Sequence, residues 1–295
     1  MLKMFARMLA MLAVLFAPVV HAQVVKDADP AIWVVRDKDT TIYLFGTVHA
    51  LKPGLGWFDE AVKDAFDKSD EVMLEVVIPE DLSGMQGTLQ RLAYNPNGPT
   101  ITELLPPEKR GPYEAAMKGV GLPPLVFESF DPWLPAMTIG SLSLPKLGYD
   151  PQQGVEQILT KAAKAAGKPI GGLETIEQQL GYFDGLPRPI QVEYLVQVVD
   201  ELPKMGETLD SMVVKWAAGD ADGLGKSMNE EMTDTPEIAK VLLYQRNQRW
   251  ADWIAERMKR PGTVFIAVGA GHLAGPNSVQ FYLSKRHLKA RRIHY

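Results

Sequence analysis

Two histidines each stand three residues after a glycine, at the ends of apolar runs that are far apart in the chain. They are His49, in the stretch GTVH at residues 46–49, and His272, in the stretch GAGH at residues 269–272. Glycine lets the backbone turn sharply, so the imidazole that follows can project from the end of a strand. Two imidazoles and a carboxylate form a ligand set for a divalent metal ion.

Two glutamates lie in stretches that can supply the carboxylate. Glu75 lies inside the apolar run VMLEVV, and Glu174 follows the run IGGL. Each candidate, taken alone, also has a structural explanation. A histidine after a strand can be a hydrogen-bonded structural residue, Glu75 can pair with a buried arginine, and Glu174 can stabilise the N-terminus of a helix. The repeated spacing favours a shared metal site, but residue types and spacing alone leave both explanations open.

The elements that would position these residues alternate between strands and helices. Apolar runs predict strands at residues 32–35, 41–45, 71–78, 169–173 and 263–268. Helical spacing predicts helices at residues 58–69, 155–166, 174–182, 190–232 (with breaks at Pro203 and around 219–225), 238–259 and 278–285. This alternation predicts an α/β fold, with a central mixed sheet flanked by helices and the two Gly-x-x-His motifs at strand ends. The carboxyl ends of strands in such sheets form the edge where ligands bind.

The mature chain, residues 23–295, has the length of a single large domain and contains no repeat or low-complexity linker. Residues 79–150 are rich in Pro, Gly and Met, and residues 190–232 are helical in pattern. We interpret both as mainly helical insertions. Because an enzyme must exclude water from its reacting groups, we expect these segments to cover the cleft that holds the two histidines.

The first 22 residues are typical of a secretory signal peptide. Lys3 and Arg7 precede the apolar stretch MLAMLAVLFAPVV, and the small-residue pattern VHA ends at Ala22. An uncleaved anchor is the alternative, but the apolar stretch is shorter than the roughly 20 residues of a spanning helix. We therefore expect a periplasmic or secreted protein with no stable membrane span after cleavage. The chain has no cysteine, which excludes a lipoprotein anchor, disulfides and thiolate ligands.

The charge of the chain excludes general binding to nucleic acid. The formal net charge is -5, and removal of Lys3 and Arg7 with the signal peptide makes it -7. An acidic protein of this kind lacks the basic surface that nucleic acids require. The locally basic tail KRHLKARRIHY is interpreted as a solvated helix end followed by a strand.

Several catalytic motifs can be excluded by their spacing. GAGHLA fits the loose dinucleotide fingerprint, but the chain ends before the further strand and acidic residue that the fingerprint needs. GDADGLGKS has Asp220 where a P-loop has its first glycine, so we interpret it as a turn between helices. Neither G-x-S-x-G nor H-E-x-x-H occurs, which excludes the α/β-hydrolase and zincin signatures.

The ordered set of motifs resembles the TraB/PrgY/GumN family, whose superfamily also contains the Tiki metalloproteases. The matching stretches are YLFGTVHALKPG, VMLEV, GYDPQQGVEQIL with AAGKPIGGLETIEQQ, RNQRWADWI and TVFIAVGAGHLAGPNSV. They occur in family order across almost the whole mature chain, and periplasmic GumN-like members are the most similar. The resemblance implies one α/β domain and, through the Tiki branch, a metal-dependent hydrolase acting on a peptide or protein substrate.

Carried over position by position, the resemblance makes His49 and His272 the motif histidines and Glu75 the acidic residue. The two histidines would bind a divalent ion, with Mn, Co and Zn all suitable, and Glu75 would complete the ligand set or act as general base. Glu174, in the matching stretch LET, is a further candidate for base or ligand.

Arg246 and Asn247 would be the polar pair on the late helix. Arg246 could stabilise a developing oxyanion, and Asn247 could orient a ligand or the substrate. Because the two residues are adjacent on one helix, we expect only one of them to face the cleft directly.

Two other functions use the same cleft without catalysis. One is a periplasmic protein that binds a metal, a haem-like ligand or a polysaccharide fragment. The other is an accessory factor in envelope or exopolysaccharide assembly. Metal-dependent turnover of peptides would distinguish a hydrolase from both.

The first testable prediction concerns processing. We expect export with cleavage after Ala22, so that Gln23 becomes the N-terminus. Intact-mass measurement of protein from the envelope fraction tests this, and a mature protein that retains Met1 would contradict it.

Overall fold

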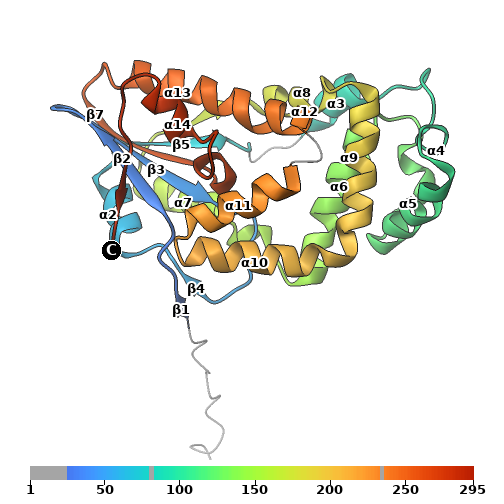
Figure 1. The fold of residues 1–295 in the computed structure, drawn as a ribbon, viewed down its shortest axis with the longest axis horizontal. Coiled ribbons are helices and arrows are strands. Elements are labelled where there is room, and N and C mark those ends of the chain that lie inside the picture. Colours follow the sequence, from blue (N-terminus) through green and yellow to red (C-terminus); the bar gives the residue numbers. More distant parts are fainter. Residues whose placement is uncertain (1–24, 80–82, 233–235) are drawn as a thin grey trace, which may run out of the picture.

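The computed structural model describes residues 25–79, 83–232 and 236–295. The expected signal peptide, residues 1–22, lies outside the described residues. Two layers of helices enclose a sheet, and a group of helices lies beyond the sheet's end (Figure 1).

The central sheet has six strands in the order β6-β5-β7-β3-β2-β8. Their bounds are β2 Ile32–Arg36, β3 Thr40–Thr47, β5 Glu71–Val76, β6 Ile170–Glu174, β7 Gly262–Gly269 and β8 Arg291–Ile293. Strands β3, β7, β5 and β6 run parallel, whereas β2 runs antiparallel to both β3 and β8. The predicted α/β fold with a mixed central sheet is therefore confirmed. A separate parallel pair joins β1 Lys26–Asp27 to β4 Leu55–Gly56.

The first two strands of the six-stranded sheet, β2 and β3, form a hairpin. Ile32 lies opposite Phe45, and Arg36 lies opposite Thr41. At the turn, the carboxylate of Asp37 accepts hydrogen bonds from the backbone N–H groups of Asp39 and Thr40. Such a bond from an Asp side chain to the backbone is a common way to stabilise a tight turn.

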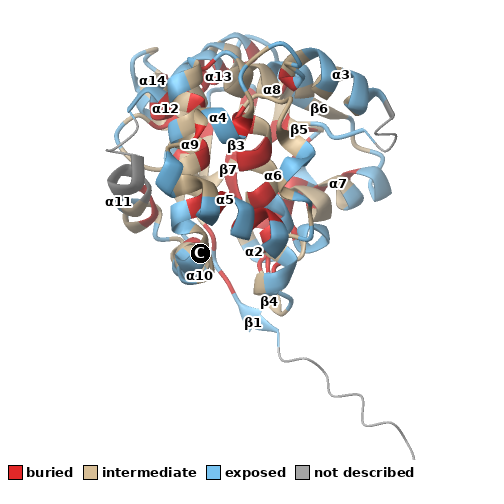
Figure 2. Ribbon diagram, turned by 90° about the vertical axis from the view of Figure 1, so that its right-hand side faces the viewer, coloured by how far each residue is buried: buried red, intermediate tan, exposed pale blue. Residues whose placement is uncertain are grey.

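Strand β7 occupies the middle of the sheet, between β3 and β5. Its residues 264–268 are all buried, as expected for a parallel strand that is covered on both faces. On one face, Phe265 and Ala267 pack with α2 (Glu60–Lys68) and α7 (Val155–Ala165). On the other face, Val264, Ile266 and Val268 pack with α13 (Gln245–Arg257) and α14 (Val279–Ser284). Buried residues gather at the centre of the molecule, around β3, β7 and α6 (Figure 2).

A second core lies within the helices beyond the end of the sheet. Helices α5 (Pro107–Gly119), α6 (Trp133–Ser143) and α9 (Arg188–Glu201) contribute its buried side chains, including Tyr113, Met117, Ile139 and Leu195. The other helices are α3 Ser83–Ala93, α4 Ile101–Leu104, α8 Ile176–Asp184, α10 Met205–Ala217, α11 Ala221–Met232 and α12 Pro236–Ala239. Figure 1 places the α5, α6 and α9 group at the end to which β3 points.

The predicted break around residues 219–225 is shorter than expected. Helix α10 ends at Ala217, Gly219 turns the chain with a φ of +64°, and α11 already begins at Ala221. The carboxylate of Asp220 accepts a hydrogen bond from the N–H of Gly223, which satisfies a free donor at the helix start. Helix α11 then passes so close to the chain at Gly275 that a Cβ on Gly225 would lie 2.5 Å from the Gly275 nitrogen. Gly225 therefore allows close packing inside a helix, where the sequence indicated a break.

Two other boundaries differ from the expected ones. Glu174 ends strand β6, and α8 begins only at Ile176, because Thr175 and Gln178 form a reciprocal capping box. Glu174 is thus a strand residue, which removes the helix-terminus explanation of its charge. The long helix predicted at residues 238–259 begins at Pro236 and contains a π-helical turn at Lys240–Tyr244, immediately before α13.

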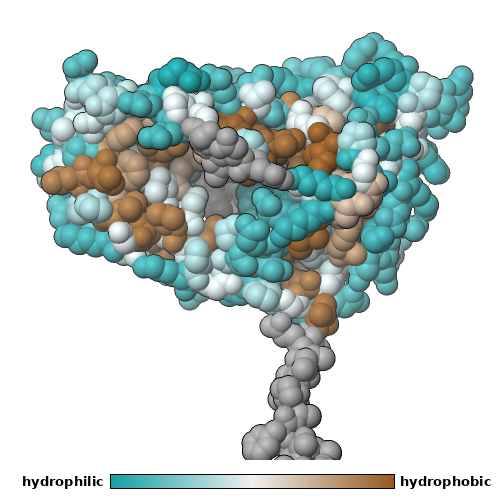
Figure 3. All heavy atoms as spheres, turned by 180° about the vertical axis from the view of Figure 1, so that it is seen from behind, coloured by the Kyte–Doolittle hydropathy of each residue, from teal (hydrophilic) through white to brown (hydrophobic). Residues whose placement is uncertain are grey.

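The surface carries hydrophobic patches among hydrophilic residues. Seen from behind, hydrophobic residues gather on two parts of the molecule, with hydrophilic residues around them (Figure 3). Within the three described ranges, no helix has the length and apolar character that a bilayer crossing requires.

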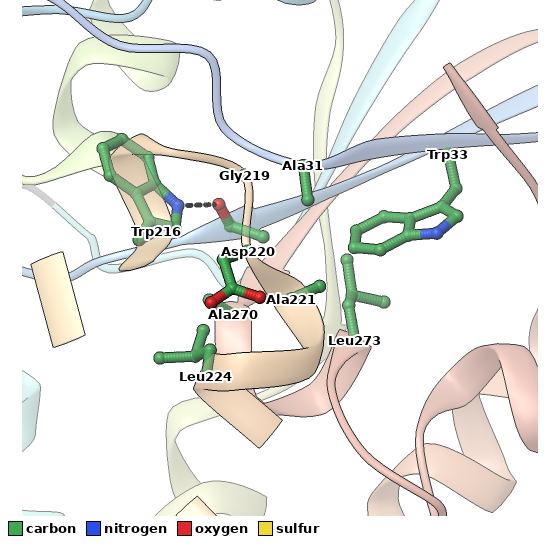
Figure 4. A pocket seen from close by; sticks show the side chains of 10 residues that line it. Ala31, Trp33, Trp216, Gly219, Asp220, Ala221, Leu224, Ala270 and Leu273 are labelled. Atoms are coloured by element: carbon green, nitrogen blue, oxygen red, sulfur yellow. Dashed lines mark hydrogen bonds between the residues drawn. The ribbon is translucent and has the colours of Figure 1, made fainter. Parts of the chain in front are cut away.

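Helix α10 contacts the end of β3 through Trp216. Strand β2 begins at Ile32, opposite Phe45, and so does not extend alongside Gly46. The indole of Trp216 donates a hydrogen bond to the Gly46 carbonyl at 2.8 Å instead (Figure 4). Trp216 therefore ties α10 to the first Gly-x-x-His stretch.

The second prediction tests this contact. Trp216→Phe should lower the free energy of unfolding by about 1–3 kcal/mol, because a buried carbonyl loses a hydrogen-bond donor. Urea denaturation measures the change. Trp253→Phe, at a half-buried tryptophan on α13, is the matched control, and an equal loss in both variants would contradict the assigned role.

Candidate functional site

The two Gly-x-x-His stretches lie side by side at one edge of the sheet. Strands β3 and β7 pair in parallel, with Thr47 opposite Gly269. A Cβ on Gly46 would lie 3.0 Å from the Cα of Ala270, so the two stretches approach each other backbone to backbone. His272 follows β7 on a short 3₁₀ helix, η6 (Ala270–Leu273).

Three of the predicted site residues surround Gly269. A Cβ on this glycine would lie 3.4 Å from Glu75 Oε2, 3.5 Å from His272 Cδ2 and 4.0 Å from His49 Cε1. The reason is the strand order, because β7 lies between β3, which leads to His49, and β5, which carries Glu75. The sheet thus brings both histidines and the glutamate to one point.

His272 is buried and held through both ring nitrogens. Its Nδ1 lies 2.6 Å from Oδ1 of Asn247, whose own amide nitrogen donates to the Asn277 carbonyl. Asn247 Oδ1 is therefore an acceptor, and Nδ1 of His272 carries the proton. Burial lowers the pKa of His272 to about 3, so the ring is neutral near pH 7 and Nε2 holds a free lone pair. This Nε2 lies 3.3 Å from Arg246 Nη1 and 3.8 Å from Glu75 Oε2.

Arg246 and Glu174 form a buried ion pair. Glu174 Oε1 accepts from Arg246 Nε at 3.0 Å, and Oε2 accepts from Nη2 at 2.7 Å. Glu174 Oε1 also accepts from the Tyr182 hydroxyl and from the Trp250 indole. With both oxygens engaged in this way, Glu174 is placed to hold the guanidinium.

Glu75 connects this ion pair to the strand ends. Its Oε1 accepts from Arg246 Nη2 and, at 2.6 Å, from Gln179 Nε2, while its Oε2 accepts from the Gly269 N–H at 3.1 Å. Burial opposes the ionisation of Glu75, whereas His272, Arg246 and His49 favour it, and the net result is a pKa of about 2. Near pH 7 His272 is neutral, so the positive charges of Arg246 and His49 keep Glu75 ionised.

Arg246 contacts Glu75 and His272 directly, whereas Asn247 reaches the site only through the imidazole of His272, in keeping with the expectation that one of the two would face the cleft. Adjacent helix positions point in different directions, but the imidazole of His272 lies between them. Arg246 contacts Nε2 of the ring, and Asn247 contacts Nδ1.

His49 depends on a residue that sequence reasoning missed. Its side chain is 73% exposed, and its Nδ1 lies 2.6 Å from Oε1 of Glu156 on α7. The negative charge of Glu156 raises the pKa of His49 to about 9. Burial would raise the pKa of Glu156, but the interaction with His49 outweighs burial and lowers it. Glu156 lies within the matching stretch GYDPQQGVEQIL, which was the available signal, as GLETIEQQ was for Gln179.

Comparison with known proteins gives the family of the chain. The TraB/PrgY/gumN family matches residues 31–292. The chain belongs to this family.

Three relatives cover most of the TraB-family chain. An uncharacterized protein of Treponema pallidum (strain Nichols) is 23% identical over 278 residues, which are 87% of this chain and 80% of the relative. The uncharacterized protein YbaP of Escherichia coli (strain K12) is 24% identical over 250 residues, or 85% and 90% of the two chains. YbaP of Shigella flexneri gives the same values. No solved structure matches the chain.

Helices from the segments expected to cover the site contact both motif stretches. In the segment 190–232, Trp216 contacts the stretch 46–49, and α11 packs against η6, which carries His272. In the segment 79–150, Asp150 pairs in an isolated bridge with Leu51, just after His49. Figure 4 shows a small cavity behind the stretches, lined by Trp33, Trp216, Leu224 and Leu273 among others. At about 10 Å³ it has room for about one water molecule, so it is not a substrate site. That residues 79–150 and 190–232 are insertions stays a prediction.

Across residues 25–79, 83–232 and 236–295, no three His, Asp or Glu side chains are placed so that they could hold a metal ion. The guanidinium of Arg246 contacts both Glu75 and His272 Nε2. The candidate metal ligands in this structure are thus joined by an arginine.

The third prediction concerns pH and uses the metal-free protein. The pKa of Glu75 is lower in the folded protein than its ordinary value of 4.5, so its ionisation stabilises the fold above pH ~4.5, and this contribution is lost as pH falls towards ~2. In Glu75→Gln, the free energy of unfolding should therefore change less between these pH values than in the wild type. Chemical denaturation at several pH values measures it. Glu177→Gln, which removes an exposed carboxylate of α8, is the control, and a Glu75→Gln profile parallel to the wild type would refute the prediction.

Proposed function

We propose that this TraB-family protein is a metal-dependent hydrolase that cleaves peptide bonds, with a divalent ion held by His49, His272 and Glu75. One observation carries the proposal, namely the meeting of these three side chains around Gly269. The N-terminal sequence supports a periplasmic or secreted location.

The donor chemistry fits a divalent ion. Nδ1 of His49 is bound to Glu156, and Nδ1 of His272 is bound to Asn247, so Nε2 is the coordinating atom of each ring. A histidine that binds metal through one nitrogen usually donates the other to a carboxylate or carbonyl oxygen. Glu75 Oε2 supplies the carboxylate, and its backbone bond to Gly269 fixes its orientation.

The charges near the site favour a cation. The carboxylates of Glu75, Glu174 and Glu156 face the single guanidinium of Arg246. Because Arg246 stays bound to Glu174 through two nitrogens, its charge is largely offset there. Glu75 and Glu156 then remain to balance a divalent ion, and His49, which Glu156 keeps protonated near pH 7, would give up its proton when its Nε2 binds the ion.

The metal would activate water and polarise the scissile carbonyl. The chain's own residues hold the reacting groups. Asn247 fixes the tautomer of His272, and Glu174 fixes the guanidinium of Arg246, whose Nη1 lies beside His272. A rigid donor in this position is suited to stabilising an oxyanion. The same geometry supports Glu174 as the residue that holds Arg246 more than as a ligand.

A non-catalytic binding protein is the second candidate. The contact of Arg246 with both His272 and Glu75 favours it, because a guanidinium in this position can bind an anionic ligand without a metal. An accessory role in envelope or exopolysaccharide assembly would follow from such binding. Neither predicts metal-dependent turnover of peptides.

The fourth prediction tests the shared metal. His49→Ala and His272→Ala should each lose most of the bound metal, and the double variant should lose little more, because residues of one site act as a unit. Metal analysis after reconstitution and dialysis measures this, and turnover of a peptide library tests the activity. His294→Ala, at an exposed histidine near the C-terminus, is the control.

Chelation provides the second measurement. A metal that binds only the folded state stabilises it by mass action, so a chelator should lower the melting temperature of the wild type and of His294→Ala. It should leave both site variants unchanged. Equal chelator sensitivity in all of these proteins, or none in any, would refute the metal site.

A further inference from the structure

The two histidines differ sharply in how they are held. His272 is 5% exposed and contacts Asn247, Arg246 and the ring of Trp250. The side chain of His49 is 73% exposed, so packing does little to select its rotamer. An exposed side chain must lose conformational entropy to stay in one orientation, so a specific interaction has to hold His49 towards Gly269.

Glu156 provides that interaction. Its Oε1 contacts His49 Nδ1 at 2.6 Å and accepts from the Thr47 hydroxyl at 2.5 Å. The Glu156 side chain is itself only 19% exposed. Because Thr47 ends β3, its hydroxyl places the carboxylate relative to the strand that leads to His49.

The backbone at the start of α7 fixes where Glu156 lies. The Val155 N–H donates to the Val48 carbonyl at 3.0 Å. A Cβ on Gly154 would lie 2.2 Å from the His49 carbonyl oxygen, so only glycine allows this approach. Residues 154–156 are therefore registered against residues 47–49 by one backbone hydrogen bond and one direct backbone contact.

We propose that Glu156 is the positioning residue of His49, and that Thr47 and Gly154 fix Glu156 in turn. The inference rests on the proposed function in one respect. The two histidines can share a metal ion only if Nε2 of His49 points towards Gly269, beside which His272 lies. Glu156 acts through His49, and its loss should leave the fold and His272 in place.

The first arm of the test uses metal-free protein and NMR. In the wild type, a cross-peak is expected between His49 Hε1 and an α proton of Gly269, because His49 Cε1 lies within about 4 Å of where the Gly269 Cβ would be. Glu156→Ala should weaken this cross-peak severalfold. Glu156→Gln, which keeps the size of the side chain and one acceptor oxygen, should weaken the cross-peak less. This variant replaces Glu156→Ala in the test if the alanine variant does not fold. Glu177→Gln is the control and should match the wild type.

The second arm measures the affinity for Zn²⁺ and Co²⁺ alone, by competition with a chelating dye. Glu156→Ala should bind about 10–100-fold more weakly, as for the loss of other groups that orient a metal-binding histidine. Thr47→Val should show a smaller loss in the same direction.

The two arms separate this inference from the proposed function. A wild type that binds neither ion refutes the metal site, whereas the NMR arm still decides the role of Glu156. An unchanged cross-peak in Glu156→Ala would overturn the positioning role. If metal affinity fell while the cross-peak persisted, Glu156 would be acting as a ligand or a charge instead, which also overturns it.

Discussion

The guanidinium of Arg246 is the charge around which the site is arranged. It is 6% exposed and lies between Glu75 and Glu174, which are 6% and 7% exposed. Charges this far from water are tolerated only when they are paired and hydrogen-bonded. The pairing joins α13 to β5 and β6, which lie far apart in the sequence. The position of one side chain thus depends on, and fixes, three elements of the fold.

The two histidines differ in protonation because His272 is buried, whereas His49 is exposed and faces a carboxylate. Next to Arg246 and inside the protein, His272 is neutral, with one nitrogen committed to Asn247. At the exposed edge, His49 faces the carboxylate of Glu156 and holds its proton more tightly. One spacing motif has therefore produced two imidazoles with opposite electrostatic surroundings. The difference comes from the helices that pack on them and not from the strands that carry them.

The distinction between strands and the helices that pack on them also decides how much could be predicted from the sequence. The strands followed from the apolar runs, and the shared site of His49, His272 and Glu75 was expected from the repeated Gly-x-x-His spacing together with the family resemblance. The strand order, which places β7 between β3 and β5, was not predicted. Glu156 and Gln179 were missed because each projects from the first turns of a helix, where the direction of a side chain depends on how that helix docks. Gly223 and Gly225 misled in the same way. They indicated a break, but Asp220 caps the helix, Gly223 leaves room for the carboxylate of Asp220, and Gly225 leaves room for the backbone at Gly275.

The central place of β7 has a consequence for the order in which the protein can be made. Of the six strands in the sheet, β7 is the second last along the chain, yet it separates β3 from β5. Until residues 262–269 have been synthesised, no strand joins the β2–β3 hairpin to the β5–β6 pair. Glu75 on β5 then cannot be placed beside His49. Translation proceeds from the N-terminus, so most of the polypeptide must be synthesised before the halves can join. Residues 262–269 are therefore the segment that joins two separate ladders into one sheet with a site.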